Sequence, residues 1–179
     1  MPRIHLYTGS GQGKTTSALG LALREIGHGY KVIIVQFMKG RKDIGEYRFP
    51  ARLKNKDMYE IYQFGTRKFI NLKKPSQNDR LIAKKGLEYV NYIIKRCIKA
   101  KNCPKLLILD EINLACAIGL LKVKDVIKFL DSLPKPITAV LTGRNAPEAL
   151  IRKADLVTDE IKIRHPFDRG VRAEKGIEY

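Results

Sequence analysis

A glycine-rich segment near the start of the chain leaves few folds open to it. Its sequence is Thr8-Gly-Ser-Gly-Gln-Gly-Lys-Thr-Thr16, and it directly follows a short apolar run at residues 4–7. Glycines at alternate positions let a backbone turn sharply and point its N–H groups at phosphate oxygens, while a lysine adds a fixed positive charge. The apolar residues that follow continue at helical spacing, so the positive end of a helix dipole points at the same anion. A strand, this loop and a helix together predict a phosphate-binding loop.

This loop supplies the predicted ligands of a nucleotide. The usual pattern is Gly-x-x-x-x-Gly-Lys-[Ser/Thr], from which the chain departs at Thr8. Lys14 is the candidate catalytic cation, and the hydroxyl of Thr15 can bind Mg²⁺. A glycine-rich turn without a ligand is the alternative, but such a turn does not require Lys-Thr-Thr after its glycines. The predicted ligands are Gly9, Ser10, Gly11, Gln12, Gly13, Lys14, Thr15 and Thr16.

A second apolar run ends in two acids. Residues 106–109 are Leu-Leu-Ile-Leu, and they are followed by Asp110 and Glu111. Consecutive apolar residues are typical of a strand that is buried on both faces in a parallel sheet. Ligands of open α/β sheets bind at the carboxyl ends of strands, where a carboxylate can hold Mg²⁺ directly or through water. Glu111 is therefore a candidate catalytic and metal-binding residue and Asp110 a candidate metal ligand, unless both acids only cap the next helix.

Strand and helix patterns alternate along the whole chain. The expected strands lie near residues 3–7, 31–37, 58–64, 106–109, 137–143 and 156–163. The expected helices run from the phosphate loop to about Ile26 and over about 77–101, 123–133 and 147–154, and residues 38–57 are expected to form a loop with room for one short helix. Such alternation predicts a mostly parallel sheet. We therefore expect one domain, residues 1–179, with an α/β three-layer P-loop NTPase (RecA-like) fold whose central sheet carries helices on both faces.

The composition and charge of the chain limit the locations and the binding partners that are expected for it. It is 44% hydrophobic and 30% charged and has no apolar run of about 18 residues, so no membrane span is expected. The three cysteines lack zinc-site spacing and the phosphate loop begins too early for a signal peptide, so a cytoplasmic location is expected. The net charge of +17 is spread along the chain. A solvated lysine-rich surface explains this charge better than nucleic-acid binding does, because no zinc finger, RNP box or KH loop is visible.

Further blocks of the sequence resemble one family of P-loop enzymes. The blocks are Thr8–Thr16, Ala22-Leu-Arg-Glu-Ile-Gly-His-Gly29, Val35-Gln-Phe-Met-Lys-Gly40, Leu109-Asp-Glu-Ile-Asn113, Leu141-Thr-Gly-Arg-Asn-Ala-Pro147, Ala154-Asp-Leu-Val-Thr158 and the tail His165–Tyr179. In this order, and over nearly the whole chain, they resemble the P-loop type of corrinoid adenosyltransferase, also called ATP:cob(I)alamin adenosyltransferase. A residue other than glycine at the position of Thr8 is usual there. The tail and the Val-Gln-Phe-x-Lys-Gly block are more specific to this family than the phosphate loop is.

The resemblance implies an enzyme that transfers the 5′-deoxyadenosyl group of ATP to the cobalt of a Co(I) corrinoid and releases triphosphate. It implies ATP and Mg²⁺ as co-substrate and cofactor, and cob(I)alamin or cobinamide as the acceptor. Thr15 and Glu111 would bind the metal directly, and Asp110 would contact these ligands rather than the metal itself. ATP would lie reversed, with its γ-phosphate where most P-loop proteins hold the β-phosphate. The family also suggests a homodimer, and the positive charge of the chain suits an acidic electron-donor protein as a partner.

Two further binding residues are predicted outside the loop. Members of the family use an aromatic Phe-x-Trp pair to displace the lower axial base of the corrinoid. Phe69 matches the Phe of that pair, but Asn71 stands where the Trp would be, and the chain contains no Trp. Phe69 is otherwise an ordinary core or surface aromatic residue. Arg144 follows an apolar strand and is a candidate contact of phosphate or nucleoside, with a helix-capping salt bridge as the alternative.

Two rival functions remain open on the sequence. The first is a P-loop ATPase or kinase that is associated with nucleic acid through the basic surface, which predicts ADP or AMP among the products. The second is a binding module, such as a corrinoid chaperone, which predicts tight ATP binding without turnover. The fold alone does not separate these functions, because P-loop domains host many chemistries.

Overall fold

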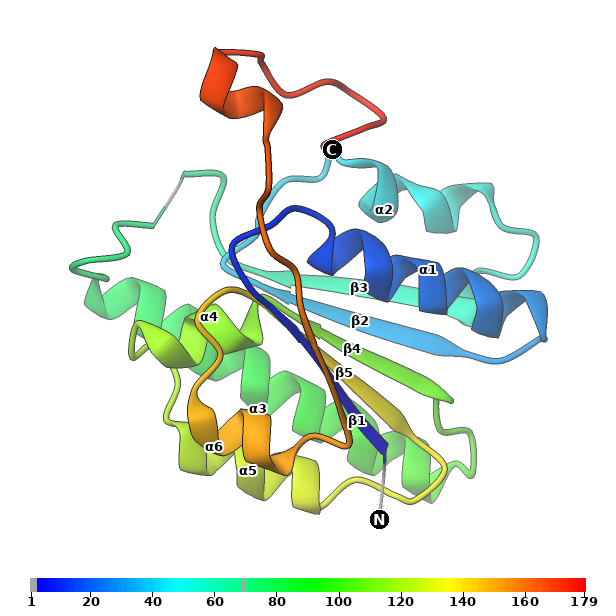
Figure 1. Ribbon diagram of the computed structural model, residues 1–179. Helices are drawn as coiled ribbons and strands as arrows, with labels where there is room; N and C mark the ends of the chain where they lie inside the picture. The colour runs from blue at the N-terminus through cyan, green and yellow to red at the C-terminus, as the bar shows by residue number, and fades with distance from the viewer. Residues whose placement is uncertain (1–2, 69) are drawn as a thin grey trace.

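The structure is a computed structural model that describes residues 3–68 and 70–179 (Figure 1). Helices and strands alternate along the chain, and every expected strand is present. The bounds are β1 Arg3–Thr8, α1 Lys14–Gly27, β2 Val32–Phe37, α2 Gly45–Arg48, β3 Tyr59–Phe64, α3 Gln77–Lys99, β4 Leu106–Asp110, α4 Ile112–Ala117, α5 Val123–Asp131, β5 Thr138–Thr142, α6 Glu148–Lys153 and β6 Leu156–Asp159. Short 3-10 helices cover Phe49–Arg52, Lys56–Met58 and Pro166–Arg169.

The six strands of the described residues form one parallel sheet in the order β3-β2-β4-β5-β1-β6. The expected parallel sheet is therefore confirmed. Strand β5 lies between β1 and β4, so the phosphate loop after β1 and the acids at the end of β4 meet at the same edge of the sheet, on either side of Thr142 at the end of β5. This edge is where open α/β sheets bind their ligands.

Helices cover both faces of the sheet, as the sequence predicts. In Figure 1, α1 and α2 lie on one face and α3, α4, α5 and α6 on the other. Strand β2 is buried on both faces, and its residues alternate between two apolar clusters. Val32 and Ile34 pack in the cluster that contains Ala18 of α1, whereas Ile33 and Val35 pack in the larger cluster beneath α3–α6. Burial of these side chains on both faces supplies most of the driving force that holds the three layers together.

Helix α3 begins and ends where local sequence signals direct it. Ser76 and Asp79 form a capping box, in which the Ser76 hydroxyl accepts from the Asp79 N–H at 3.1 Å and the Asp79 carboxylate accepts from the Ser76 N–H at 2.9 Å. At the other end Lys101 has a left-handed φ of 51°, and the N–H of Asn102 donates to the carbonyl of Cys97 at 3.0 Å. This closing turn is of the Schellman type and ends the helix slightly before the predicted position.

Helix α4 and the last strand differ most clearly from the sequence prediction. Helix α4 is not predicted, because four of its six residues are buried and its short apolar sequence carries no helical period. The last strand, predicted over 156–163, ends at Asp159, because the chain leaves the sheet at Glu160, where the Glu160 carbonyl accepts from the N–H of Gly11 at 2.5 Å.

After β6 the chain crosses the carboxyl edge of the sheet. In Figure 1 this segment, drawn in orange and red, rises past the phosphate loop, arches away from the sheet and ends beside the start of α2. The C-terminal tail, residues 160–179, therefore lies over the edge where the phosphate loop and the acids meet. No helix among residues 3–68 and 70–179 has the length and apolar character to cross a membrane.

Candidate active site

The phosphate loop joins β1 to α1 in a backbone conformation that requires glycine at two positions. Gly9 and Gly13 have φ angles of 101° and 126°, which side chains of other residues rarely tolerate. Gly13 is the N-cap of α1 and has no side chain to cap the helix. The N–H groups of the first turn are therefore available to an external acceptor. Together with the helix dipole, they favour an anion at this end of the helix.

Lys14 lies inside this loop with its ammonium turned back on the backbone. Its Nζ donates to the carbonyl of Gly9 at 2.9 Å and also to the carbonyl of Gly11. The residue is only 7% exposed, and burial is the main cause that lowers the pKa of its ammonium; the nearby Glu160 carboxylate opposes the shift and Arg144 adds to it. Lys14 forms no salt bridge with any residue that the structure describes. Its charge is thus held in place beside the loop by carbonyl oxygens alone.

A cavity of about 430 Å³ opens above the loop. The predicted site residues that line it are Gly11, Gln12, Gly13, Lys14, Thr15, Thr16, Glu111 and Arg144. Gly9 and Ser10 do not line it: Gly9 holds Lys14, and the Ser10 hydroxyl accepts from the N–H of Lys162 at 3.4 Å. Phe69 lies outside the described residues. The fold thus brings most of the predicted site to one cavity.

Asp110 is fully buried behind Thr15 and is surrounded by donors. Its Oδ1 accepts from the hydroxyls of Thr15 at 2.8 Å and Thr142 at 2.6 Å. Its Oδ2 accepts from the side-chain amide of Gln36 at 3.0 Å and from the ammonium of Lys39 at 2.6 Å. Burial alone would raise the pKa of Asp110, but Lys39 and the two hydroxyls hold it below its usual range. With four donors the carboxylate is saturated; it orients the Thr15 hydroxyl and does not itself line the cavity.

Glu111 differs from Asp110 in the partners of its carboxylate and in the direction of its pKa shift. Its backbone has a left-handed φ of 63°, and its N–H donates to the Thr142 hydroxyl at 3.0 Å. Its Oε2 is buried and has no hydrogen-bond partner among the described residues. Burial first, and then the charge of Asp110, raise the pKa of this carboxyl. A buried carboxylate oxygen without a donor, beside an anion-binding loop, has the arrangement of a cation ligand.

Lys39 belongs to this cluster and was given no role by the sequence reasoning. It follows β2 through Met38, which has a left-handed φ of 59° and donates its N–H to the carbonyl of Phe64 at 2.8 Å. Gly65 approaches this turn so closely that a Cβ there would lie 2.3 Å from the Met38 carbonyl carbon. The backbone of Lys39 is therefore held firmly and directs the side chain toward Asp110. The Val-Gln-Phe-Met-Lys-Gly block was the available signal, but its spacing does not reveal this contact.

Glu160 is the second residue that sequence reasoning missed. Its N–H donates to the carbonyl of Thr8 at 2.9 Å, and its carboxylate accepts from the Ser17 hydroxyl at 3.3 Å. A Cβ at Gly13 would lie 2.5 Å from Glu160 Oε2. This carboxylate therefore lies beside the N-terminus of α1, close to where an external anion is expected. No local pattern predicts it, since it depends on the course of the tail after β6.

The end of the C-terminal tail forms the outer wall of the cavity. His165 and Gly176–Tyr179 line it, although none of them belonged to the predicted site. The Arg41 guanidinium lies 4.5 Å above the ring centre of Tyr179 and so ties the tail to the loop after β2. His165 accepts the N–H of Phe167 at 3.1 Å through Nδ1, which caps the short helix that follows.

A second cavity, of about 530 Å³, adjoins the first. Lys39, Glu178 and Tyr179 line both cavities, and Thr66, Arg67 and Lys68 line only the second. The loop that leads to Phe69 therefore borders the second cavity, and the described residues that line this cavity include none from the phosphate loop. This arrangement provides room for a substrate larger than a nucleotide.

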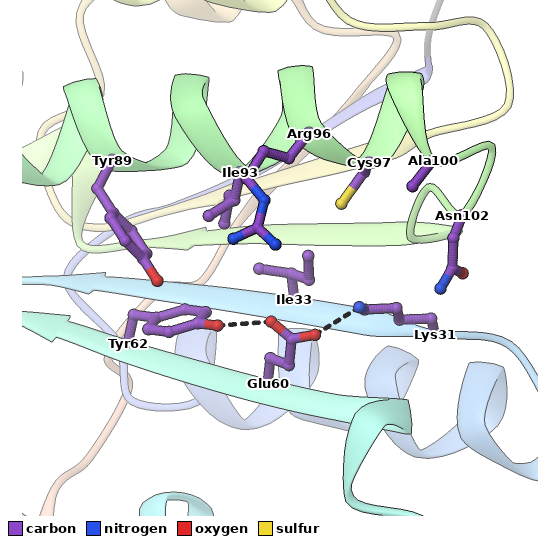
Figure 2. Close-up of a pocket in the computed structure, with 10 residues that line it drawn as sticks. All are labelled: Lys31, Ile33, Glu60, Tyr62, Tyr89, Ile93, Arg96, Cys97, Ala100 and Asn102. Atoms are coloured by element: carbon purple, nitrogen blue, oxygen red, sulfur yellow. Dashed lines mark hydrogen bonds and ion pairs between the residues drawn. The ribbon is translucent and has the colours of Figure 1, made fainter.

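A third cavity, of about 220 Å³, lies between α3 and the starts of β2 and β3 (Figure 2). Lys31 pairs with Glu60, and the Tyr62 hydroxyl donates to the same carboxylate at 2.6 Å. Arg96 and Cys97 face this group from α3. The Glu60 carboxylate in this cavity is thus already paired with Lys31 and Tyr62. The cavity also lies at the amino ends of the strands, away from the phosphate loop, and is not part of the candidate site.

Comparison with known proteins gives one consistent family. The sequence model described as ATP:corrinoid adenosyltransferase BtuR/CobO/CobP matches residues 1–179. A corrinoid adenosyltransferase of Sinorhizobium sp is 37% identical over 98% of this chain and 79% of its own length. The corrinoid adenosyltransferase of Escherichia coli K12 is 30% identical over 98% of this chain and 85% of its own length. A solved ATPase of a bacterial type III secretion system aligns at 15% identity with a TM-score of 0.48, and the match spans 94% of this chain but only about half (53%) of that one.

Proposed function

Since the chain belongs to the ATP:corrinoid adenosyltransferase family BtuR/CobO/CobP, we propose that the cavity above its phosphate loop holds the triphosphate of ATP during adenosyl transfer. The chain is an enzyme that transfers the adenosyl group of ATP to the cobalt of a corrinoid. The observation that carries the proposed site is the convergence on one cavity of Lys14 and of Glu111, whose Oε2 has no hydrogen-bond partner among the described residues. The cationic loop would bind the polyphosphate, and the Glu111 carboxylate would bind the metal ion that accompanies it.

The chemistry of the transfer explains why such a site suffices. A Co(I) nucleophile carries no proton, so its attack on the ribose 5′ carbon needs no general base. The barrier lies in placing cobalt in line with the C5′–O bond and in stabilising the triphosphate that departs as that bond breaks. In this proposal the loop N–H groups and the Lys14 ammonium hold the triphosphate, whose total negative charge grows as the bond breaks. Arg144, exposed on the rim of the same cavity, supplies a further cation toward the phosphates.

A bound triphosphate requires a rearrangement of two side chains in this proposal. Lys14 would exchange the carbonyls of Gly9 and Gly11 for phosphate oxygens, which are stronger acceptors. The Glu160 carboxylate would leave the N-terminus of α1, because two anions do not share that end of the helix. In the reversed orientation that the family implies, the γ-phosphate would take this innermost position.

The residues present fit a magnesium ion. No cluster of three or more His, Cys, Asp or Glu side chains occurs in the part of the chain that the structure describes. Mg²⁺ does not need one, since it is commonly bound by one or two carboxylates together with substrate phosphates and water. We assign its protein ligands to the Thr15 hydroxyl and the Glu111 carboxylate, with Asp110 as the acceptor that orients Thr15. When bound, the metal neutralises charge on the departing triphosphate.

The corrinoid would occupy the second cavity, beside the loop that carries Phe69. Thr66, Arg67 and Lys68 support this placement, because they line that cavity immediately before Phe69 in the chain. We propose that Phe69 covers the lower face of the corrinoid and helps to displace its axial base. The family's Trp is absent at Asn71, so cobinamide, which has no lower base to displace, would be the easier substrate.

This proposal predicts a selective effect of Phe69→Ala. ATP binding should be unchanged, because the phosphate loop is untouched. Adenosylation should fall when a weak protein donor must reduce Co(II), and fall much less when a strong chemical reductant supplies Co(I). The measurement compares the variant with the parent enzyme on cobalamin and cobinamide under both reductants. Equal loss in all four conditions would show that Phe69 is a structural residue.

The partners and location are part of the same proposal. We propose that residues 1–179 act as a single domain, that the enzyme is a homodimer, and that an acidic protein delivers the electron to Co(II). The net charge of +17 supports the last point, since opposite charge speeds encounter between proteins. A cytoplasmic location is supported by three cysteines that are free thiols.

The direct test of the reaction is made under anoxia. The protein is incubated with ATP, Mg²⁺ and chemically reduced cobalamin, the visible spectrum is followed, and the polyphosphate released is identified. Triphosphate should appear in step with the adenosylated corrinoid, and little ATP should be consumed without corrinoid. ADP as the main product would instead support a kinase or ATPase.

A further inference from the structure

The metal position contains a positive charge that the function proposed above does not use. Lys39 Nζ lies 2.6 Å from Asp110 Oδ2 and 3.3 Å from Thr15 Oγ1. Its side chain is 28% exposed, whereas that of Asp110 is fully buried. A buried carboxylate without a counter-charge is costly, so Asp110 needs a cation whether or not a metal is present. Lys39 is the residue that supplies it.

The hydroxyl of Thr15 shows that Lys39 and a metal would compete for one atom. This hydroxyl has a single proton, which it donates to Asp110 Oδ1. Its oxygen lone pairs are therefore left to accept from a hydrogen-bond donor or to bind a metal ion. In the structure the Lys39 ammonium donates to this oxygen at 3.3 Å. The ammonium is therefore the cation that Thr15 contacts when no metal is bound.

We propose that Lys39 is the resident counter-cation of the metal position. It neutralises Asp110 and holds Thr15 ready, and it keeps a divalent ion from binding before the nucleotide. The metal then enters together with ATP. Thr15 and Glu111 alone do not carry enough negative charge to bind a divalent ion beside the Lys39 ammonium, and the phosphates of ATP supply the rest. This inference rests on the metal position proposed above, and Lys39 is a positioning residue within it.

The backbone supports a fixed role for this lysine. The left-handed Met38 and the close approach of Gly65 hold the turn that carries Lys39. The charged groups that face its ammonium are Asp110, Glu111 and Glu46. Only Asp110 is in direct contact with it, and Glu46 accepts a hydrogen bond from Gln36 at 3.3 Å. The ammonium is thus directed at the carboxylate that orients the proposed metal ligand.

The test measures Mn²⁺ binding by electron paramagnetic resonance on the whole protein without nucleotide. We expect Lys39→Met to bind Mn²⁺ about tenfold or more tightly than the parent, because removal of a like charge a few ångströms from the ion strengthens binding. Its thermal midpoint should fall without metal and recover with Mn²⁺. Lys42→Met makes the same change at an exposed lysine of the same loop and should leave Mn²⁺ binding unchanged.

A double variant and the parent protein keep the inference testable if Lys39→Met does not fold. Lys39→Met/Asp110→Asn removes both charges and should regain thermal stability without any gain in Mn²⁺ affinity. The parent protein should bind Mn²⁺ far more weakly without nucleotide than with a non-reactive ATP analogue. Saturable micromolar Mn²⁺ binding to the nucleotide-free parent would overturn the inference, and so would a folded Lys39→Met that binds Mn²⁺ no better than the parent.

The same titration separates this inference from the proposed metal site. If Mn²⁺ and the ATP analogue together give no protein-bound signal in the parent, the assignment of Thr15 and Glu111 itself is wrong. If that signal is normal but Lys39→Met gains nothing, the metal site remains and only the role of Lys39 is wrong.

Discussion

Replacing Lys14 by alanine is expected to slow adenosyl transfer about a hundred- to thousandfold. The variant removes a charge-assisted contact to the departing triphosphate, which is typically worth about 3–4 kcal/mol in the transition state. The loss should appear mainly in kcat, because the charge on the polyphosphate grows as the C5′–O bond breaks. The measurement is the rate of adenosylcorrinoid formation with chemically reduced corrinoid at saturating ATP.

The control for Lys14 is Lys42→Ala. Lys42 is exposed and does not line the cavity, so its loss should change the rate by no more than about threefold, as for a screened surface charge. Lys14→Ala turning over as fast as Lys42→Ala would show that Lys14 does not contact the polyphosphate.

Glu111→Gln is expected to lower the rate about a hundredfold or more at ordinary Mg²⁺ concentrations. The change preserves the shape of the side chain but replaces a charged metal ligand with a neutral amide, and metal stabilisation of a phosphoryl oxygen is worth several kcal/mol. High Mg²⁺ should restore part of the activity. The measurement is the Mg²⁺ dependence of the rate for the parent and the variant, with Glu88→Gln, the same change at an exposed glutamate of α3 that does not line the cavity, as the control.

The same variant should be at least as stable as the parent without metal. Burial raises the folded-state pKa of Glu111 above its unfolded value, so ionising it disfavours the folded state once the pH exceeds the ordinary glutamate range. A neutral glutamine removes this cost at neutral pH. A lower thermal midpoint, together with normal Mg²⁺ dependence, would mean that Glu111 supports the fold rather than the metal.

The sequence predicts the scaffold of this protein well because its signals are local. The phosphate loop is recognisable from its glycines and its Lys-Thr pair, and the run at 106–109 predicts a strand that is buried on both faces. Ser76 marks the start of α3 through a capping box that involves only near neighbours. Helix α4 was not predicted, because it is short and buried on most sides and its sequence therefore shows no periodic pattern of apolar and polar residues.

The different environments of the Asp110 and Glu111 carboxylates could not be predicted from the sequence in the same way. Both acids follow the same strand, and the sequence offered both as metal ligands. Their difference arises from the left-handed backbone of Glu111 and from donors on three other segments, which saturate Asp110. The contacts of Lys39 and Glu160 likewise join residues that are 71 and 143 positions apart in the chain. Periodicity and spacing carry no information about such pairs.

The central claim, that ATP is cleaved at C5′ with triphosphate as the leaving group, is tested most directly by labelling the bond that breaks. ATP carrying ¹⁸O at the oxygen that bridges C5′ and the α-phosphorus is incubated under anoxia with Mg²⁺ and chemically reduced corrinoid, and the products are examined by ³¹P NMR and mass spectrometry. Attack of cobalt on C5′ must leave the ¹⁸O in triphosphate, with one labelled triphosphate for each adenosylcorrinoid. ¹⁸O retained in ADP, AMP or adenosine would contradict the account, because the bond to C5′ would then have stayed intact.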